Sequence, residues 1–118
     1  TLREWDYGDY EGITTPEIRK SIPNWTVWSH GCPNGEDAQA VQQRCEQTIE
    51  IALAAPGEGD VALFAHGHLL RALTGTWLGL GATAGRYFQL GTGTICILGF
   101  ERGQRIIARW NAPTNSLF

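Results

Sequence analysis

The 118-residue sequence lacks several features that would each indicate a class of protein. It contains no methionine, only one lysine among its nine basic residues, and a formal net charge of −3. That charge provides no basic field for nucleic acid. No apolar run approaches the roughly 18 residues of a membrane span, and no signal peptide is recognisable. We therefore expect a protein that binds neither nucleic acid nor membrane.

Cysteine is also scarce. The three cysteines, Cys32, Cys45 and Cys96, are odd in number and have no C-x-x-C spacing. Such thiols are typical of a reduced, cytoplasmic protein rather than of a disulfide framework or a zinc site. The sequence thus predicts a cytoplasmic location, with no metal and no cofactor.

The composition otherwise indicates a packed domain. Apolar residues make up 42% of the chain, which favours a globular protein over disorder. By length the chain fits one small domain, and no repeat or long linker divides it.

The most informative stretch is residues 60–71, where an apolar run leads through His66-Gly67-His68 into a helical pattern. The run Val61–Ala65 is typical of a buried parallel strand, and ligands bind at the carboxyl end of such strands. Gly67 lets the chain turn sharply and a ligand approach, and the N–H groups that open a helix favour an anion. The stretch predicts a phosphate-binding corner, although a single histidine there is also common as a turn or core residue.

Three segments have the marks of helices. Thr14-Thr15-Pro16-Glu17 is typical of a helix start, and that helix should end near Ser21. Residues 36–55 place apolar side chains at three- and four-residue intervals, and Pro56-Gly57 ends the pattern. Residues 69–80 form the third segment.

The remaining patterns predict a hairpin and a loop. Residues 95–100 and 105–110 read as strands, and the turn between them contains Gly103. Residues 21–35 read as a cap or lid loop, in which Trp28 and His30 either line a pocket mouth or simply pack.

A second motif lies upstream of the phosphate corner, in residues 2–12, Leu-Arg-Glu-Trp-Asp-Tyr-Gly-Asp-Tyr-Glu-Gly. Together with Gly35-Glu36 and His66-Gly67 it forms an ordered pattern that resembles the histidine phosphatase superfamily, the phosphoglycerate-mutase-like fold. The resemblance covers nearly the whole chain. The sequence is most similar to actinobacterial acid phosphatases once labelled phosphoglycerate mutases, and the segments that carry this likeness are Glu4–Gly8, Thr14–Pro16 and His30–Pro33.

One element of that family does not occur in these residues, the Arg-His-Gly whose histidine is the nucleophile. His30 and His66 precede glycine, but Ser29 and Ala65 stand before them. His66 follows Glu4 and so matches the family's second histidine. The resemblance implies that this chain is part of a longer domain, that the nucleophile lies on a missing segment, and that these residues alone are inactive.

The resemblance also implies roles for individual residues. His66 would stabilise the charge of the phosphoryl group, and Glu4 would donate a proton to the leaving group and then activate water. Tyr7, Gly67 and His68 would bind substrate, although Tyr7 is equally explained by packing and the His68 side chain by exposure to solvent.

These roles imply a phosphomonoester hydrolase of the acid phosphatase type, acting on a small phosphorylated substrate through a phosphohistidine, without a cofactor. A cofactor-dependent phosphoglycerate mutase is an alternative, but its substrate clamp needs an arginine pair, and residues 25–30 contain no arginine. An alternative of another class is a non-catalytic remnant that binds phosphate or a partner. A homodimer also remains open.

The fold implied is α/β, the C-terminal part of a three-layer phosphoglycerate-mutase-like sandwich with a mostly parallel sheet and an antiparallel edge. We expect residues 1–118 to form a single partial domain that lacks the first strands of that fold. The strand at Val61–Ala65 would then expose unpaired backbone and an apolar face.

Overall fold

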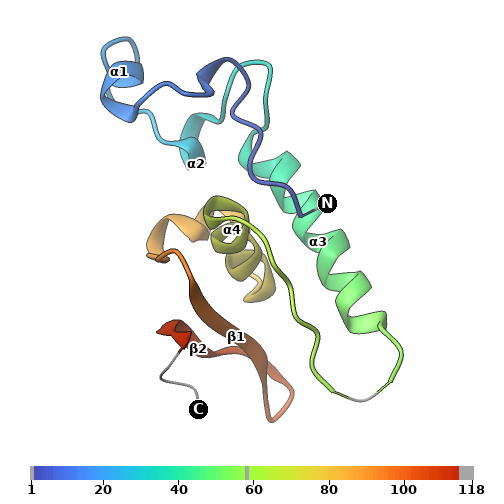
Figure 1. The fold of residues 1–118 in the computed structure, drawn as a ribbon. Helices are drawn as coiled ribbons and strands as arrows, with labels where there is room; N and C mark the ends of the chain where they lie inside the picture. The colour runs from blue at the N-terminus through green and yellow to red at the C-terminus, as the bar shows by residue number, and fades with distance from the viewer. Residues whose placement is uncertain (1, 58, 115–118) are drawn as a thin grey trace.

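The computed structural model describes residues 2–57 and 59–114 of the chain. The molecule is elongated, with extents of 49 × 29 × 22 Å and a radius of gyration of 15.3 Å (Figure 1). A compact chain of this length would have a radius of gyration of about 13.5 Å. In chain order the elements are η1 (Gly8–Tyr10), α1 (Thr15–Arg19), α2 (Val27–His30), α3 (Ala38–Ala54), α4 (Gly67–Trp77), η2 (Ala82–Tyr87), β1 (Thr94–Glu101) and β2 (Gln104–Pro113).

Helix α3 is the long helix that the spacing predicts, and it begins two residues later than expected. The Asp37 side chain caps it by accepting a 2.9 Å hydrogen bond from the Ala40 N–H. Its apolar stripe is buried, and Val41 and Cys45 are fully enclosed. The packing of that stripe, rather than helix propensity, therefore sets the position of α3.

Helix α4 crosses α3 and carries the centre of the core. It begins at Gly67, two residues before the predicted start, and ends at Trp77. The positive φ angles of Gly79 and Gly81 end the helical path early. Leu69, Ala72 and Leu73 are buried against α3 and η2, so α4 is held on two sides.

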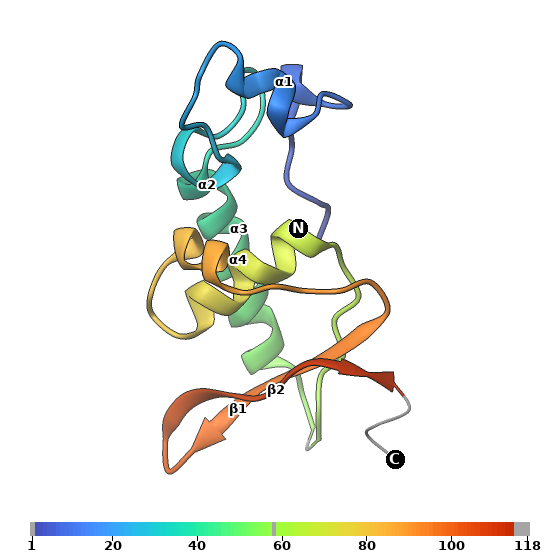
Figure 2. The ribbon, with the colours of Figure 1, turned by 90° about the vertical axis from the view of Figure 1, so that its left-hand side faces the viewer.

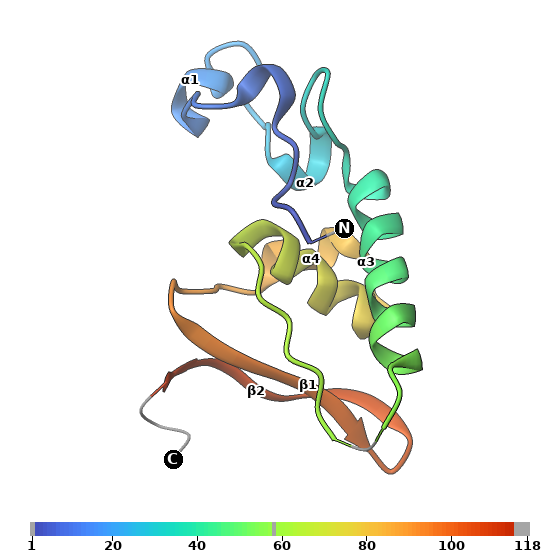
Figure 3. The ribbon, with the colours of Figure 1, turned by 45° about the vertical axis from the view of Figure 1, so that its right-hand side comes forward.

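The N-terminal segment is held against the loop that precedes α3. The Asp9 N–H donates to the Pro33 carbonyl at 2.9 Å, and the Glu36 N–H donates to the Asp6 carbonyl at 2.8 Å. Gly8 has a φ of +51°, and a Cβ there would lie 2.2 Å from the Pro33 carbonyl oxygen. Only glycine permits this contact, which brings the segment down between α3 and α4 (Figures 1 and 3).

The hairpin of β1 and β2 confirms the predicted pair of strands. Glu101 pairs with Gln104 across a two-residue turn, and both turn residues, Arg102 and Gly103, have positive φ. This is the turn geometry that matches the twist of antiparallel strands. Figure 2 shows the hairpin as a separate layer below the helices.

Tryptophan side chains attach the hairpin to the helices. Trp77 of α4 donates from its Nε1 to the Ile106 carbonyl at 3.2 Å and meets the Phe100 ring at 5.1 Å. Trp110 donates to the Gln89 carbonyl at 2.6 Å. The hairpin therefore joins the helices through a few large side chains.

The predicted parallel strand at Val61–Ala65 is wrong for the described residues. This segment is extended but pairs with no described strand, and the sheet has only β1 and β2, which are antiparallel. A strand exists only through its ladder of hydrogen bonds to a neighbour, and none of the described residues forms such a ladder with this segment. Phe64 is accordingly 88% exposed, although Leu63 and Ala65 pack against the core, and Figure 3 shows the segment leading from the end of α3 to the start of α4.

The predicted loop at residues 21–35 contains a short helix, α2. The side chains of Thr26 and Ser29 form a reciprocal cap at its start. Trp25 and Trp28 are both buried, at 6% and 8% exposed. The helix α1 confirms the predicted start at Thr14, although the Thr14 side chain makes no capping hydrogen bond.

Candidate active site

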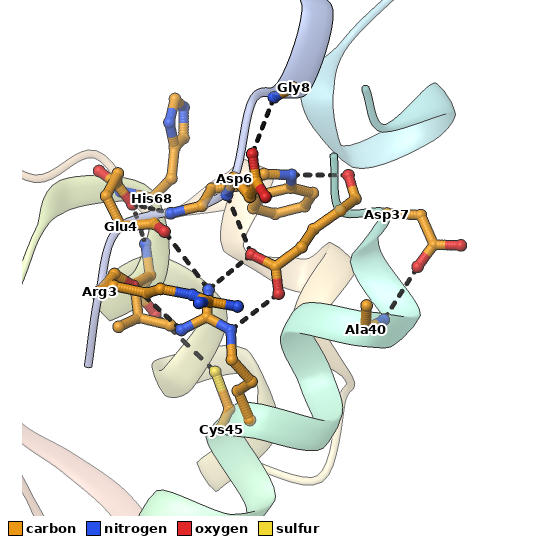
Figure 4. Close-up of polar contacts among 12 residues, drawn as sticks. Arg3, Glu4, Asp6, Gly8, Asp37, Ala40, Cys45 and His68 are labelled. Atoms are coloured by element: carbon orange, nitrogen blue, oxygen red, sulfur yellow. Dashed lines mark hydrogen bonds and ion pairs between the residues drawn. The ribbon is translucent and has the colours of Figure 1, made fainter. Parts of the chain in front are cut away.

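Glu4 and His66, the two predicted catalytic residues, both lie at the N-terminal end of α4. The Glu4 Oε1 atom accepts hydrogen bonds from the Leu69 N–H at 2.9 Å and the Trp5 N–H at 2.8 Å. Its Oε2 atom accepts from the His68 N–H at 3.2 Å. His66 is the residue that precedes the helix, with extended backbone and an exposed side chain. Figure 4 shows the Glu4 carboxylate turned toward the α4 backbone.

The N–H groups at this helix end hold an anion, and in this structure that anion is the Glu4 carboxylate. The orphan N–H groups of a first helical turn and the positive end of the helix dipole both favour negative charge. The same two amides were the expected phosphate donors. Glu4 thus lies where a phosphoryl group would be recognised.

Gly67 stands where the chain passes from extended backbone at His66 into α4. Gly67 is the first residue of α4 and is not among the glycines with positive φ. A Cβ at this position would have no atom of the described residues within 4 Å. The space in front of Gly67 is open, so the chain's own packing places no demand for glycine there.

The Tyr7 and His68 side chains are paired. The Tyr7 hydroxyl lies 2.5 Å from His68 Nδ1, and their rings meet edge to face at 5.7 Å. Burial lowers the pKa of His68, the Arg71 charge adds to this, and the nearby Glu4 partly opposes it. Burial, followed by the charges of Glu4 and Glu11, raises the pKa of Tyr7. The pair is therefore a neutral imidazole beside a protonated phenol.

Two tryptophans surround the His68 ring. Trp28 lies at 5.6 Å and Trp5 at 6.3 Å between ring centroids, and the two indoles meet edge to face at 5.3 Å. Arg71 covers the other side of Trp28, with its guanidinium carbon 5.1 Å from the ring centroid. Arg71 donates to the Gly85 carbonyl at 3.0 Å, so it holds η2 rather than forming the salt bridge that its position suggests.

A cleft of about 460 Å³ opens beside this aromatic cluster. Its wall includes Tyr7, Tyr10, Trp25, Trp28, His68 and Arg86. The predicted substrate-binding residues Tyr7 and His68 are therefore brought together on one surface. A larger hollow of about 560 Å³ lies beyond it and is lined by His30, Cys32 and Asp37, away from Glu4 and His68.

Glu36 and Arg44 hold the segment that carries Glu4 in place. Arg44 donates to both carboxylate oxygens of Glu36, at 2.7 and 2.8 Å, and also to the Arg3 carbonyl at 3.0 Å. The Asp6 N–H donates to Glu36 at 2.9 Å, and Trp5 Nε1 donates to the Glu36 carbonyl at 2.9 Å. These contacts fix the backbone on both sides of Glu4 (Figure 4).

The charges of this pair stabilise each other. Burial would raise the pKa of Glu36, but the hydrogen bonds and charge of Arg44 outweigh burial and lower it. The hydrogen bond to Glu36 raises the pKa of Arg44. Sequence reasoning places Glu36 near the site but misses Arg44. Its spacing could have revealed it. Arg44 lies three positions after Val41 and four before Thr48, so a charged residue falls on the buried stripe of α3 and needs a partner there.

The Cys32 and Cys45 thiols are poor nucleophiles, and the described residues offer no metal site. Burial raises the pKa of Cys32 and of Cys45 to about 11, so both thiols stay protonated. Residues 2–57 and 59–114 contain no group of three His, Cys, Asp or Glu side chains that could hold a metal ion. Nor does any helix in these ranges have the length and apolar character to cross a bilayer.

The sequence matches a family model described as "Histidine phosphatase superfamily (branch 1)" over residues 1–113. It is 46% identical to an acid phosphatase of Mycobacterium tuberculosis over 107 residues, which cover 91% of this chain and 53% of that protein. It is 42% identical to a sedoheptulose 1,7-bisphosphatase of Saccharomyces cerevisiae, covering 68% of this chain and 35% of that protein. The chain thus spans about half or less of the length of these relatives.

Two solved structures are similar to this chain in fold. The protein from an open reading frame of M. tuberculosis superposes with a TM-score of 0.89 at 44% identity, over 93% of this chain and 57% of that one. An α-ribazole phosphatase from Shigella flexneri superposes with a TM-score of 0.73 at 22% identity, over 92% of this chain and 57% of that one. The second likeness is one of fold alone.

Proposed function

Because this chain belongs to the histidine phosphatase superfamily, we propose that it carries the proton-donor side of a phosphomonoester hydrolase of the acid phosphatase type. The observation that supports this most directly is the Glu4 carboxylate at the N-terminal end of α4, where it accepts hydrogen bonds from the amides of His68 and Leu69, two and three residues after His66. Both an acid and a histidine thus lie at a helix end suited to phosphate.

The first chemical step uses a nucleophile from a segment outside these 118 residues. A histidine nitrogen of that segment attacks phosphorus, the bond from phosphorus to the ester oxygen breaks, and Glu4 transfers a proton to the leaving oxygen. His66 stabilises the charge on the phosphoryl oxygens. Glu4 accepts three N–H hydrogen bonds, which hold its carboxyl group at the end of α4.

The second step hydrolyses the phosphohistidine. A water molecule gives its proton to the Glu4 carboxylate and attacks phosphorus, and the bond from phosphorus to nitrogen breaks. The amides that hold Glu4 orient it for both proton transfers, so one carboxylate serves as acid and then as base.

We also propose that strands from the same outside segment complete a three-layer sandwich on the sheet side. Phe64 is 88% exposed and Val61 is 49% exposed on a backbone that is already extended. A neighbouring strand would pair with this backbone and cover these side chains.

The test is turnover of p-nitrophenyl phosphate at mildly acidic pH. We expect no activity from the 118-residue chain and clear activity from the full-length protein. In the full-length protein, Glu4→Gln should lower kcat by about 100-fold or more, the usual size of a general acid–base contribution. His66→Ala should also remove most activity.

His30→Ala is the matched control, because His30 also precedes glycine but is exposed and pairs only with Ser29. It should leave turnover unchanged. Turnover by the 118-residue chain that disappears with His66→Ala would contradict the proposal that the nucleophile lies outside it.

A further inference from the structure

The Tyr7 hydroxyl can donate to His68 Nδ1 or to the Glu4 carboxyl group beside it, and the direction of the Tyr7–His68 hydrogen bond follows the tautomer of His68. The Tyr7 hydroxyl lies 2.5 Å from Nδ1, and its raised pKa keeps it protonated. A phenol that donates to Nδ1 requires that nitrogen to be an acceptor. In a neutral imidazole the proton must then sit on Nε2.

The surrounding rings fix the orientation of this imidazole. Trp5, Tyr7 and Trp28 meet it at interplanar angles between 74° and 81°. Figure 4 shows the ring pointing away from the Glu4 network, while the backbone amide of the same residue turns toward Glu4. The backbone amide of His68 therefore binds Glu4, while its imidazole ring points to the opposite side.

The free nitrogen of the His68 ring is Nε2. No described residue makes a hydrogen bond to it, and among the described residues every buried side-chain nitrogen and oxygen has a partner. Nε2 is thus open to solvent rather than enclosed, and His68 forms part of the cleft wall. With its proton on Nε2, it presents a single, oriented N–H donor.

The charged groups around His68 leave this donor uncharged. Glu4 and Tyr7 approach from the N-terminal segment and Arg71 from α4, and burial outweighs the attraction of Glu4 for a second proton. A neutral N–H donor suits a neutral acceptor oxygen, whereas a phosphate would be better served by an imidazolium.

We propose that the Tyr7–His68 pair determines specificity for the leaving group. Tyr7 fixes the Nε2–H tautomer, and Nε2–H donates a hydrogen bond to an uncharged ether, carbonyl or hydroxyl oxygen on the alcohol part of the substrate, within the aromatic cleft. His68 is the residue that touches substrate, and Tyr7 is a positioning residue. This inference rests on the proposed phosphatase function.

The first test is imidazole ¹⁵N NMR on the full-length protein. The expected result is a neutral His68 with its proton on Nε2, and Tyr7→Phe should mix the tautomers. Tyr87→Phe is the control, since it removes a phenolic hydroxyl from a side chain that is 71% exposed and outside the cleft wall. A proton on Nδ1, or an imidazolium at neutral pH, would overturn the proposal.

The second test compares two matched substrate series, the methoxyphenyl phosphates and the ethylphenyl phosphates. The methoxy oxygen is an acceptor that the ethyl group lacks, at nearly equal size. We expect KM to favour the best methoxy isomer by about tenfold, the value of one hydrogen bond of about 1.4 kcal/mol. The kcat values should differ little.

His68→Leu should abolish this preference, and His68→Gln should restore part of it, because its amide nitrogen can occupy the position of Nε2. An equal preference in the wild type and His68→Leu would refute the inference. Absence of phosphatase activity in the full-length protein would refute the proposed function instead, and the NMR result would still decide the tautomer.

Discussion

The helical side of the molecule (residues 2–54 with α4) and the sheet side (residues 59–66 with β1 and β2) are packed very differently. On the helical side Trp5, Val41 and Leu69 are at most 2% exposed. On the sheet side Phe64 is 88% and Phe100 56% exposed. The helical side, which carries the candidate site, therefore has a buried core made from the described residues. The sheet side instead exposes large apolar side chains to solvent.

The largest effect should come from the ion pair that stabilises the helical side. Arg44→Met leaves Glu36 buried without its partner, and we expect a loss of about 3–5 kcal/mol in the free energy of unfolding. Urea denaturation of the full-length protein measures it.

Lys20→Met is the control for that change, because its 3.0 Å contact with Glu17 is solvent-exposed and worth less than about 1 kcal/mol. Equal effects of Arg44→Met and Lys20→Met would show that the Glu36–Arg44 pair does not hold the helical side together.

The second prediction concerns Phe64 and tests whether the sheet side is covered in the full-length protein. In the 118-residue chain Phe64→Ser should change stability by less than about 0.5 kcal/mol, because the ring is exposed. In the full-length protein the loss should approach the roughly 3 kcal/mol of a buried aromatic residue. Denaturation of both proteins tests this, and equal small losses would mean that no segment covers this surface.

The third prediction is a difference in pH dependence. Both lowered pKa values make acid destabilising, because the unfolded chain binds each proton first. The contribution of His68 should be complete above pH 6.5 and should be lost as the pH falls through its folded pKa. That of Glu36 should be complete above pH 4.5 and be lost at lower pH.

Unfolding free energies measured across this pH range should therefore fall in two steps. His68→Gln should remove only the upper step, and Glu36→Gln only the lower one. An upper step that persists in His68→Gln would assign it to another group.

The smallest effect on stability is expected at Gly67. Gly67→Ala meets no described atom and should change the unfolding free energy by less than about 1 kcal/mol. It should still lower turnover, since the methyl group would occupy the open space in front of the α4 amides. Gly8→Ala should instead lower turnover by destabilising the fold. Its Cβ would lie 2.2 Å from the Pro33 carbonyl oxygen, which would unfold the N-terminal segment.

The sequence predicts the elements whose information is local. The stripe of α3, the start of α1 and the hairpin turn at Gly103 each follow from residues within one or two turns of chain. The strand at Val61–Ala65 fails because strand formation depends on a partner that a local pattern cannot supply.

The same distinction applies to the site. The motifs single out Glu4 and His66, and the structure puts Glu4 on the helix end that His66 precedes, while their catalytic roles stay predictions. Arg44 and the Tyr7–His68 contact were missed because each depends on residues that meet only after folding, 40 and 61 positions apart.

The hydrogen bond from the Leu69 N–H to Glu4 also has a kinetic consequence. It joins residues 65 positions apart, whereas the hairpin joins Glu101 to Gln104 through a two-residue turn. By the logarithmic scaling of loop closure, the longer closure costs about 3 kcal/mol more in chain entropy. Local contacts in α3 and the hairpin should therefore form first, and the meeting of Glu4 with α4 is among the last events of folding. Pulsed hydrogen exchange during refolding would show when the Leu69 amide becomes protected by its hydrogen bond to Glu4.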